Sequence, residues 1–228
     1  MSSESEFFKE GDGSSKTLVV SFGGCITKPK GYVPFEFLNF LNKNFPEIDC
    51  GFYVDLNKSW YSKGIAGISE DVPSTVAYLE EKVKGYDKVI FLGVSAGGYA
   101  SLLFSSLVKG VTHSIAFDPQ TDVEDCGKND VIAERHAHGL ANLDKRYGDI
   151  IPHLSDTVEY NVYARFTYKG DGNWIHRGYH SERLIDLKKK NIFVHRIKKD
   201  ITGLRDSGEL LDIITKHVTT WFLTTFII

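Results

Sequence analysis

Short runs of apolar, β-branched and aromatic residues recur along the chain and alternate with longer stretches of helical character. Strands that alternate with helices are typical of a mainly parallel sheet. The predicted strands are Thr17–Phe22, Gly51–Asp55, Lys88–Leu92, His113–Phe117, Tyr160–Phe166 and Asn191–Ile197. The pattern therefore predicts an α/β fold, a three-layer sandwich in which helices cover both faces of one mostly parallel central sheet.

Helical stretches fall between these strands. The predicted helices are one opened by Pro34, Val72–Lys84, Ala96–Val108, one near Ser181–Lys189 and a final helix from Ser207. Proline suits a first helical turn because its missing N–H has no partner there. The chain has 228 residues and no visible repeat or linker, so a single domain is expected.

Two segments interrupt this rhythm. Residues 1–15 are polar, acidic and Gly/Ser-rich, without the apolar core of a signal peptide, which predicts a flexible tail ahead of a domain over 16–228. Residues 121–154 are polar and irregular, which predicts a small insertion or cap.

The C-terminal run from Trp221 to Ile228 is strongly apolar. It is too short to span a bilayer, so no membrane span is expected. A terminal helix docked on the core is one interpretation. The alternative is a self-association surface that would make the protein a homo-oligomer.

Charge and cysteine content exclude several classes of function. The formal net charge is −3, so there is no basic field for nucleic acid. The three cysteines show no CxxC spacing, which fits neither a disulfide framework nor a zinc site and indicates a reducing, cytoplasmic compartment. His136-Ala137-His138 lacks a third ligand at a recognised spacing. No metal or other cofactor is predicted.

The most informative segment is Gly93-Val94-Ser95-Ala96-Gly97. A buried apolar run leads into it and a predicted helix leaves it, which is the context of a nucleophile elbow. The turn strains the serine backbone, so bulk must be absent two residues away on either side. The helix N-terminus, with the N–H of Ala96, would then stabilise an oxyanion. A glycine-rich turn that serves packing or cradles a phosphate is the alternative.

With the sequence GVSAGGYASLLFSSL followed by AFDPQTDV, the chain resembles the α/β-hydrolase superfamily of serine esterases and lipases. It also resembles small hydrolase-like domains that accompany polysaccharide-modifying enzymes. The resemblance implies a second oxyanion donor in the loop after the first main strand, where Gly24 stands. It further implies a triad in the order serine, acid, histidine.

The acid is expected after the strand that follows the insertion. Asp171 lies there between two glycines, although an ordinary turn would use the same residues. Asp118, directly after the preceding strand, is the alternative acid.

The base departs from the pattern of the superfamily. The loop Lys198–Gly203, where the histidine is expected, contains none; His195 lies within a strand and His217 within the final helix. Any catalytic histidine should therefore come from the segment after Asp171, with His180 preferred over His176. The alternative is that both are structural.

The loop after the second predicted strand contains Trp60 and Tyr61. These rings are expected either to contact substrate, for example a sugar ring, or to anchor the loop. The sequence thus predicts an ester hydrolase or acyl transferase that uses Ser95 on a small-molecule or carbohydrate ester. The alternative is a non-catalytic module of the same fold that binds a glycan or a protein partner and has lost the triad histidine.

Overall fold

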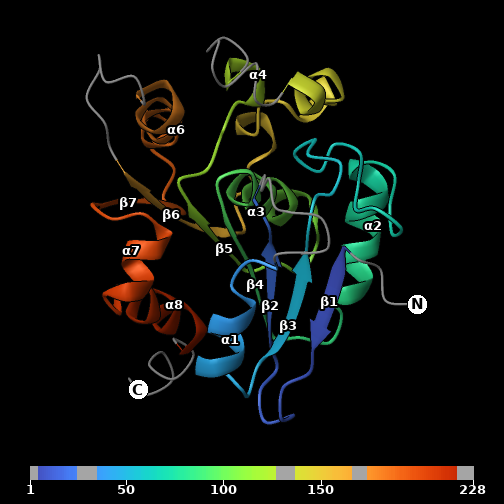
Figure 1. Cartoon of the computed structure of the whole chain (residues 1–228), viewed down its shortest axis with the longest axis vertical. Helices are drawn as coiled ribbons and strands as arrows, with labels where there is room; N and C mark the ends of the chain where they lie inside the picture. Colours follow the sequence, from blue (N-terminus) through green and yellow to red (C-terminus); the bar gives the residue numbers. More distant parts are fainter. Residues whose placement is uncertain (1–4, 25–34, 127–136, 166–173, 220–228) are drawn as a thin grey trace.

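One twisted sheet forms the centre of the protein (Figure 1). The computed structural model describes residues 5–24, 35–126, 137–165 and 174–219. Within them seven strands lie in the order β1-β3-β2-β4-β5-β6-β7. Their bounds are β1 Glu6–Lys9, β2 Thr17–Phe22, β3 Asp49–Tyr53, β4 Lys88–Val94, β5 His113–Phe117, β6 Glu159–Arg165 and β7 Ile192–Ile197.

Strand β4 lies between β2 and β5 and is parallel to both. Its residues from Lys88 to Gly93 are buried, because helices cover both faces of the sheet there. All neighbouring pairs except β1–β3 are parallel. The predicted three-layer α/β fold with a mostly parallel sheet is therefore confirmed.

Two apolar cores lie on opposite faces of the sheet. The helices are α1 Leu38–Asn44, α2 Val72–Lys82, α3 Ala96–Leu107, α4 Val123–Cys126, α6 Trp174–Asp186, α7 Ile201–Asp206 and α8 Glu209–Thr219. Side chains of α2, α3 and α6 fill one core, and those of α1, α7 and α8 fill the other. Figure 1 shows the two sets on either side of the sheet.

The N-terminal segment departs from the prediction. Residues 6–9, expected within a flexible tail over 1–15, form β1 and pair antiparallel with β3. The Phe7 ring lies 6.1 Å from that of Phe52, and Lys9 Nζ donates to the carbonyl of Ile48 at 2.7 Å. Pairing and these contacts order a segment whose composition is typical of a loose tail.

Helix bounds differ most at three places. Helix α1 begins at Leu38, after Phe37 in a left-handed conformation, and Pro34 lies outside the described residues. Helix α6 begins at Trp174, seven residues earlier than predicted. The expected loop Lys198–Gly203 is shortened by α7, because the Asp200 side chain accepts the N–H of Gly203 and caps that helix.

The predicted insertion adds no described strand to the sheet. It contains α4, a helical stretch at 137–141 and two short 3₁₀ turns, Lys145–Tyr147 and Ile151–His153. It packs over the loop after β3, since a Cβ at Gly139 would lie 2.0 Å from the carbonyl oxygen of Lys58. Among the described helices, none is long and apolar enough to cross a bilayer; the apolar run from Trp221 lies outside the described residues.

A substitution at Gly97 would test how tightly α3 packs on the sheet. A Cβ at this position would lie 2.1 Å from the carbonyl oxygen of Phe22, whereas a Cβ at Gly51 would meet nothing closer than 3.4 Å. Gly97→Ala should therefore lower the free energy of unfolding by about 1–3 kcal/mol or more, and Gly51→Ala should be neutral or slightly stabilising. Urea unfolding of both variants checks this. Equal effects would contradict the packing.

The burial of His217 leads to a prediction of how the stability of the protein depends on pH. This residue is buried on α8, and its Nε2 shares a hydrogen bond of 2.8 Å with Tyr163 Oη. Burial lowers the pKa of His217 to about 4, below the ordinary value of about 6.5. The unfolded chain therefore takes up the proton first as the pH falls, and stability present above pH 6.5 is lost towards pH 4.

This histidine should account for about 2–3 kcal/mol of the loss in unfolding free energy between pH 7 and pH 4.5. His217→Gln keeps an acceptor for Tyr163 but does not titrate, so its stability should fall less over the same range. Urea unfolding at the two pH values measures the difference. Parallel losses in both proteins would reject this role for His217.

Candidate active site

Ser95 joins the end of β4 to the start of α3 with φ 55° and ψ −119°. These are the strained dihedral angles expected of the predicted turn. Its N–H donates to the carbonyl of Phe117, which fixes the turn to β5. The two flanking glycines are required sterically: a Cβ at Gly93 would lie 2.0 Å from the carbonyl oxygen of Gly97, and Gly97 itself lies against Phe22.

The first turn of α3 and the end of β2 meet beside Ser95. A Cβ added at Gly24 would lie 4.0 Å from the Cβ of Ser95. The preceding residue is fixed, because Gly23 donates its N–H to Tyr53 and its carbonyl accepts the Tyr61 hydroxyl. The backbone of Gly24 and the N-terminus of α3, which begins at Ala96, therefore flank the serine. A helix N-terminus in this position favours negative charge on a ligand.

The side-chain partner of Ser95 among the described residues is an amide. Gln120 Nε2 donates to Ser95 Oγ at 3.2 Å. Gln120 is buried, with 2% of its surface exposed, and its Oε1 has no hydrogen-bond partner within the described part of the chain. No described histidine is hydrogen-bonded to Ser95.

The segment that carries Gln120 is held from several sides. Asp118 has a left-handed backbone, and its carboxylate accepts from the backbone N and the Nε of Arg165 at 2.8 and 2.6 Å. The alternative acid Asp118 therefore pairs with an arginine at the end of β6. Pro119 packs on α3, where a Cβ at Gly98 would lie 3.1 Å from the Pro119 Cβ.

His180 binds Thr121, the residue that follows Gln120, and is not hydrogen-bonded to Ser95. It is buried on α6, and its Nδ1 accepts the N–H of Thr121 at 3.1 Å. A ring nitrogen that accepts a backbone N–H carries no proton, so the neutral ring is protonated at Nε2. In this arrangement Nε2 is a donor, and the ring offers no acceptor to the Ser95 hydroxyl.

The other candidate triad residues either fall outside the described part of the chain or contact other groups. Asp171 lies outside the described residues, and the structure describes the backbone but not the side chain of His176 within α6. His195 stacks on the ring of Tyr163 at 4.5 Å between centroids, and its Nε2 contacts Asn161 Oδ1. The loop 198–200 between β7 and α7 contains no histidine.

Trp60 and Tyr61 lie in the core. They are 2% and 0% exposed, and both have left-handed backbones. Asp55 organises their loop, since its Oδ2 accepts the N–H groups of Ser59 and Tyr61, and burial raises the pKa of the Asp55 carboxyl above its ordinary value. The two rings anchor the loop, so the expectation of direct substrate contact is not supported by their placement.

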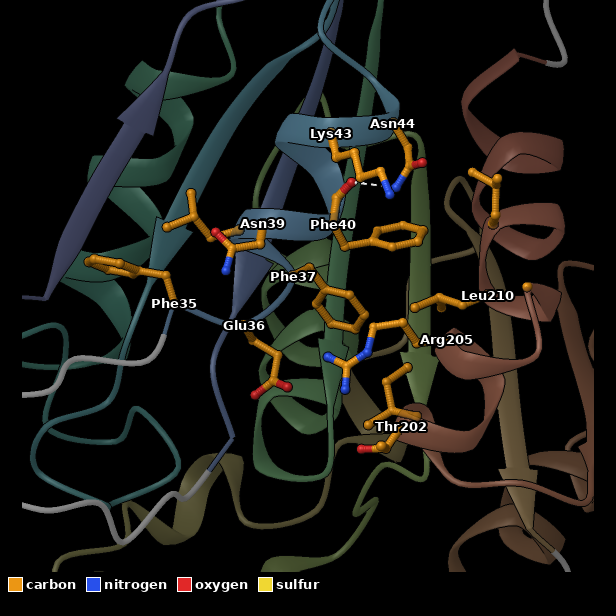
Figure 2. Close-up of a pocket in the computed structure, with 14 residues that line it drawn as sticks. Phe35, Glu36, Phe37, Asn39, Phe40, Lys43, Asn44, Thr202, Arg205 and Leu210 are labelled. Carbon is orange, nitrogen blue, oxygen red and sulfur yellow. Dashed lines mark hydrogen bonds between the residues drawn. The ribbon is translucent and has the colours of Figure 1, made fainter.

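A pocket of about 500 Å³ lies between α1 and the α7–α8 pair. Figure 2 shows Phe37 and Phe40 facing Arg205 and Leu210 across it, with Glu36 and Thr202 at one end. Ser95 is not among its lining residues, but the rings of Phe37 and Phe117 lie 6.2 Å apart, and the Phe117 carbonyl accepts the Ser95 N–H. Phe37, which lines the pocket, therefore packs against Phe117, the residue that accepts the Ser95 N–H.

Gln120 is the site residue that the sequence analysis missed. It follows β5 by three residues, and β5 lies next to β4 in the sheet. Ligands in open α/β sheets bind at the carboxyl ends of the strands. A search of every polar residue just after the strand next to the Gly-x-Ser-x-Gly motif would have found it.

Neither a protein-family model nor a curated protein sequence matches the chain. Solved structures do. A lipase/esterase from Lactobacillus plantarum is 10% identical with a TM-score of 0.56, over 92% of this chain and 91% of that one. FphF, a fluorophosphonate-binding serine hydrolase from Staphylococcus aureus, is 12% identical with a TM-score of 0.59, over 92% and 84%.

A third similarity is to the Glycosylation Associate Protein (Gap123) complex from Streptococcus agalactiae, at 13% identity and a TM-score of 0.60. It covers 95% of this chain and 44% of that one. At these identities the likeness shows a shared fold and nothing finer. The chain therefore has the fold of these α/β-hydrolase structures.

Proposed function

We propose that the protein is a serine-dependent acyl hydrolase or acyl transferase, with Ser95 as the nucleophile. The observation that carries this proposal is the conformation of Ser95, which is strained, flanked by sterically required glycines and placed at the start of α3. Strain of this kind costs about 1–3 kcal/mol and concentrates at functional sites. A turn that served packing alone would not need a half-buried hydroxyl at its apex.

In the proposed reaction the Ser95 oxygen attacks the carbonyl carbon of an ester. Negative charge then develops on the carbonyl oxygen, and the backbone N–H groups of Ala96 and Gly24 would stabilise it. Losing one such donor typically costs about 10²–10³ in rate. The ester C–O bond then breaks, the alcohol leaves with the proton lost by Ser95, and an acyl-serine remains. Water or an acceptor hydroxyl takes the acyl group from Ser95 and returns a proton to the serine oxygen.

An acylated carbohydrate is the substrate class we favour. The resemblance to domains that accompany polysaccharide-modifying enzymes supports it, as does the fold shared with a glycosylation-associated complex. The pocket beside Phe37 and Phe40 combines aromatic rings with polar side chains such as Asn39 and Arg205, a mixture that can both stack on a sugar ring and hydrogen-bond to its hydroxyls. In this proposal those rings take the role first expected of Trp60 and Tyr61.

One observation favours the alternative, a binding module that does not catalyse. The described partner of the Ser95 hydroxyl is Gln120, which is not a base. Without an adjacent base a serine hydroxyl is a weak nucleophile at neutral pH. The same site would then bind the ester or glycan without cleaving it.

A fluorophosphonate probe separates the two functions. The wild-type protein should become labelled, and Ser95→Ala should lose all labelling, because the probe forms its bond with the serine oxygen. Ser105→Ala is the matched control, since that hydroxyl is buried on the same helix and donates to the Leu102 carbonyl. Mass spectrometry of the intact protein measures the adduct.

An unlabelled wild-type protein that still binds an O-acetylated sugar would support the binding module instead. A labelled protein should then be tested for acetate release from O-acetylated sugars and from p-nitrophenyl acetate. Release from the simple ester alone would reject the carbohydrate substrate.

A further inference from the structure

We propose that Gln120, and not an imidazole, is the hydrogen-bond partner that orients the Ser95 hydroxyl. We further propose that His180 acts indirectly, by fixing the position of Thr121, the residue next to Gln120. Both are positioning residues in this scheme. The inference extends the proposed function of Ser95, but the contact that it names can be tested without any catalysis.

The position of Gln120 supports the first part. It is almost fully buried, its Nε2 lies 3.2 Å from Ser95 Oγ, and its backbone is held on both sides by Asp118 and Thr121. A carboxamide donates through nitrogen and accepts through oxygen, but it does not take up a proton near neutral pH. Gln120 can therefore orient the hydroxyl without removing its proton.

The contacts of His180 support the second part. Its Nδ1 accepts the N–H of Thr121, and the Thr121 hydroxyl lies within 3.1 Å of the same nitrogen. Arg183, one turn further along α6, donates to the same hydroxyl and to Asp149 at 2.6 Å. Helix α6 therefore fixes the residue next to Gln120 through two side chains.

The charged groups around this arrangement are largely paired. Asp118 binds Arg165, which also lies 3.9 Å from Asp200. Arg183 binds Asp149 and lies 4.0 Å from Asp122, and the ring of Tyr179 lies 5.3 Å from that of His180. No described titratable side chain is hydrogen-bonded to Ser95 to set a pKa for its reaction.

A distinctive dependence on pH follows. When Ser95 reacts with a fluorophosphonate, the oxygen–phosphorus bond forms, fluoride leaves, and the hydroxyl proton passes to hydroxide from the solvent. The labelling rate should therefore rise about tenfold per pH unit between pH 6 and 9. A serine activated by histidine would instead reach a plateau above the imidazole pKa, near 6.5.

Two variants of His180 separate its two ring nitrogens. His180→Asn places an amide oxygen near the position of Nδ1 and can still accept the Thr121 N–H. His180→Gln reaches the position of Nε2 instead. If His180 acts through Thr121, the Asn variant should label within threefold of wild type, and the Gln and Ala variants should label about tenfold or more slowly because Gln120 shifts.

The contact between Gln120 and Ser95 is measured by unfolding, which needs no activity. Thermal midpoints are compared for wild type, Gln120→Met, Ser95→Ala and the double variant. If the two side chains are bonded, the double variant should lose less than the sum of the two single losses. Gln120→Met keeps the length of the side chain but removes the amide. As a control, the losses in thermal midpoint for Ser105→Ala and Gln120→Met should add up in their double variant.

Some outcomes would overturn the inference. Additive losses for Gln120 and Ser95 would reject their contact. A labelling plateau near pH 7 that disappears in both His180→Asn and His180→Gln, or in His176→Gln, would assign the base to that histidine. A wild-type protein that is never labelled would refute the proposed catalysis. The inference would still stand if the losses for Gln120 and Ser95 were non-additive, and if His180→Asn were as stable as wild type while His180→Gln were less stable.

Discussion

The close approach of α3 to the ends of β2 and β4 is the constraint on which the rest of the site depends. Gly97 lies against the carbonyl of Phe22, and Gly93 lies against Gly97. Because no side chain separates these backbones, the turn between β4 and α3 is tight, and Ser95 takes a positive φ of 55° within it. The same approach brings Gly24 beside the serine, so one steric condition positions the hydroxyl and both backbone segments that flank it.

The central sheet could be predicted from the sequence because its strands are buried on both faces and read as continuous apolar runs. Strand β1 could not. It has four residues, two of them exposed phenylalanines at 41% and 37%, and its order comes from pairing with β3 rather than from its own composition. Helix α7 was missed for a related reason, since its start depends on a cap from Asp200 that looks like an ordinary loop residue.

The candidate site shows the same division. Ser95 and its glycines follow from a local motif whose spacing carries the steric requirement. Gln120 and His180 reach the site through tertiary contacts, from the end of a neighbouring strand and from α6. Sequence reasoning placed His180 near the correct edge of the sheet, but it could not tell which ring nitrogen is engaged, because that depends on the backbone N–H of Thr121.

The antiparallel direction of β1 also determines where the chain enters the domain. Glu6 pairs with Tyr53, the last residue of β3, and Ser5 lies beside Ala66 in the loop region that follows. The first described residues therefore lie at the edge where the parallel strands end, the edge that carries Ser95. A tag, linker or domain fused directly to Ser5 would start on that side, where it could restrict access to the site or present it to a tethered substrate.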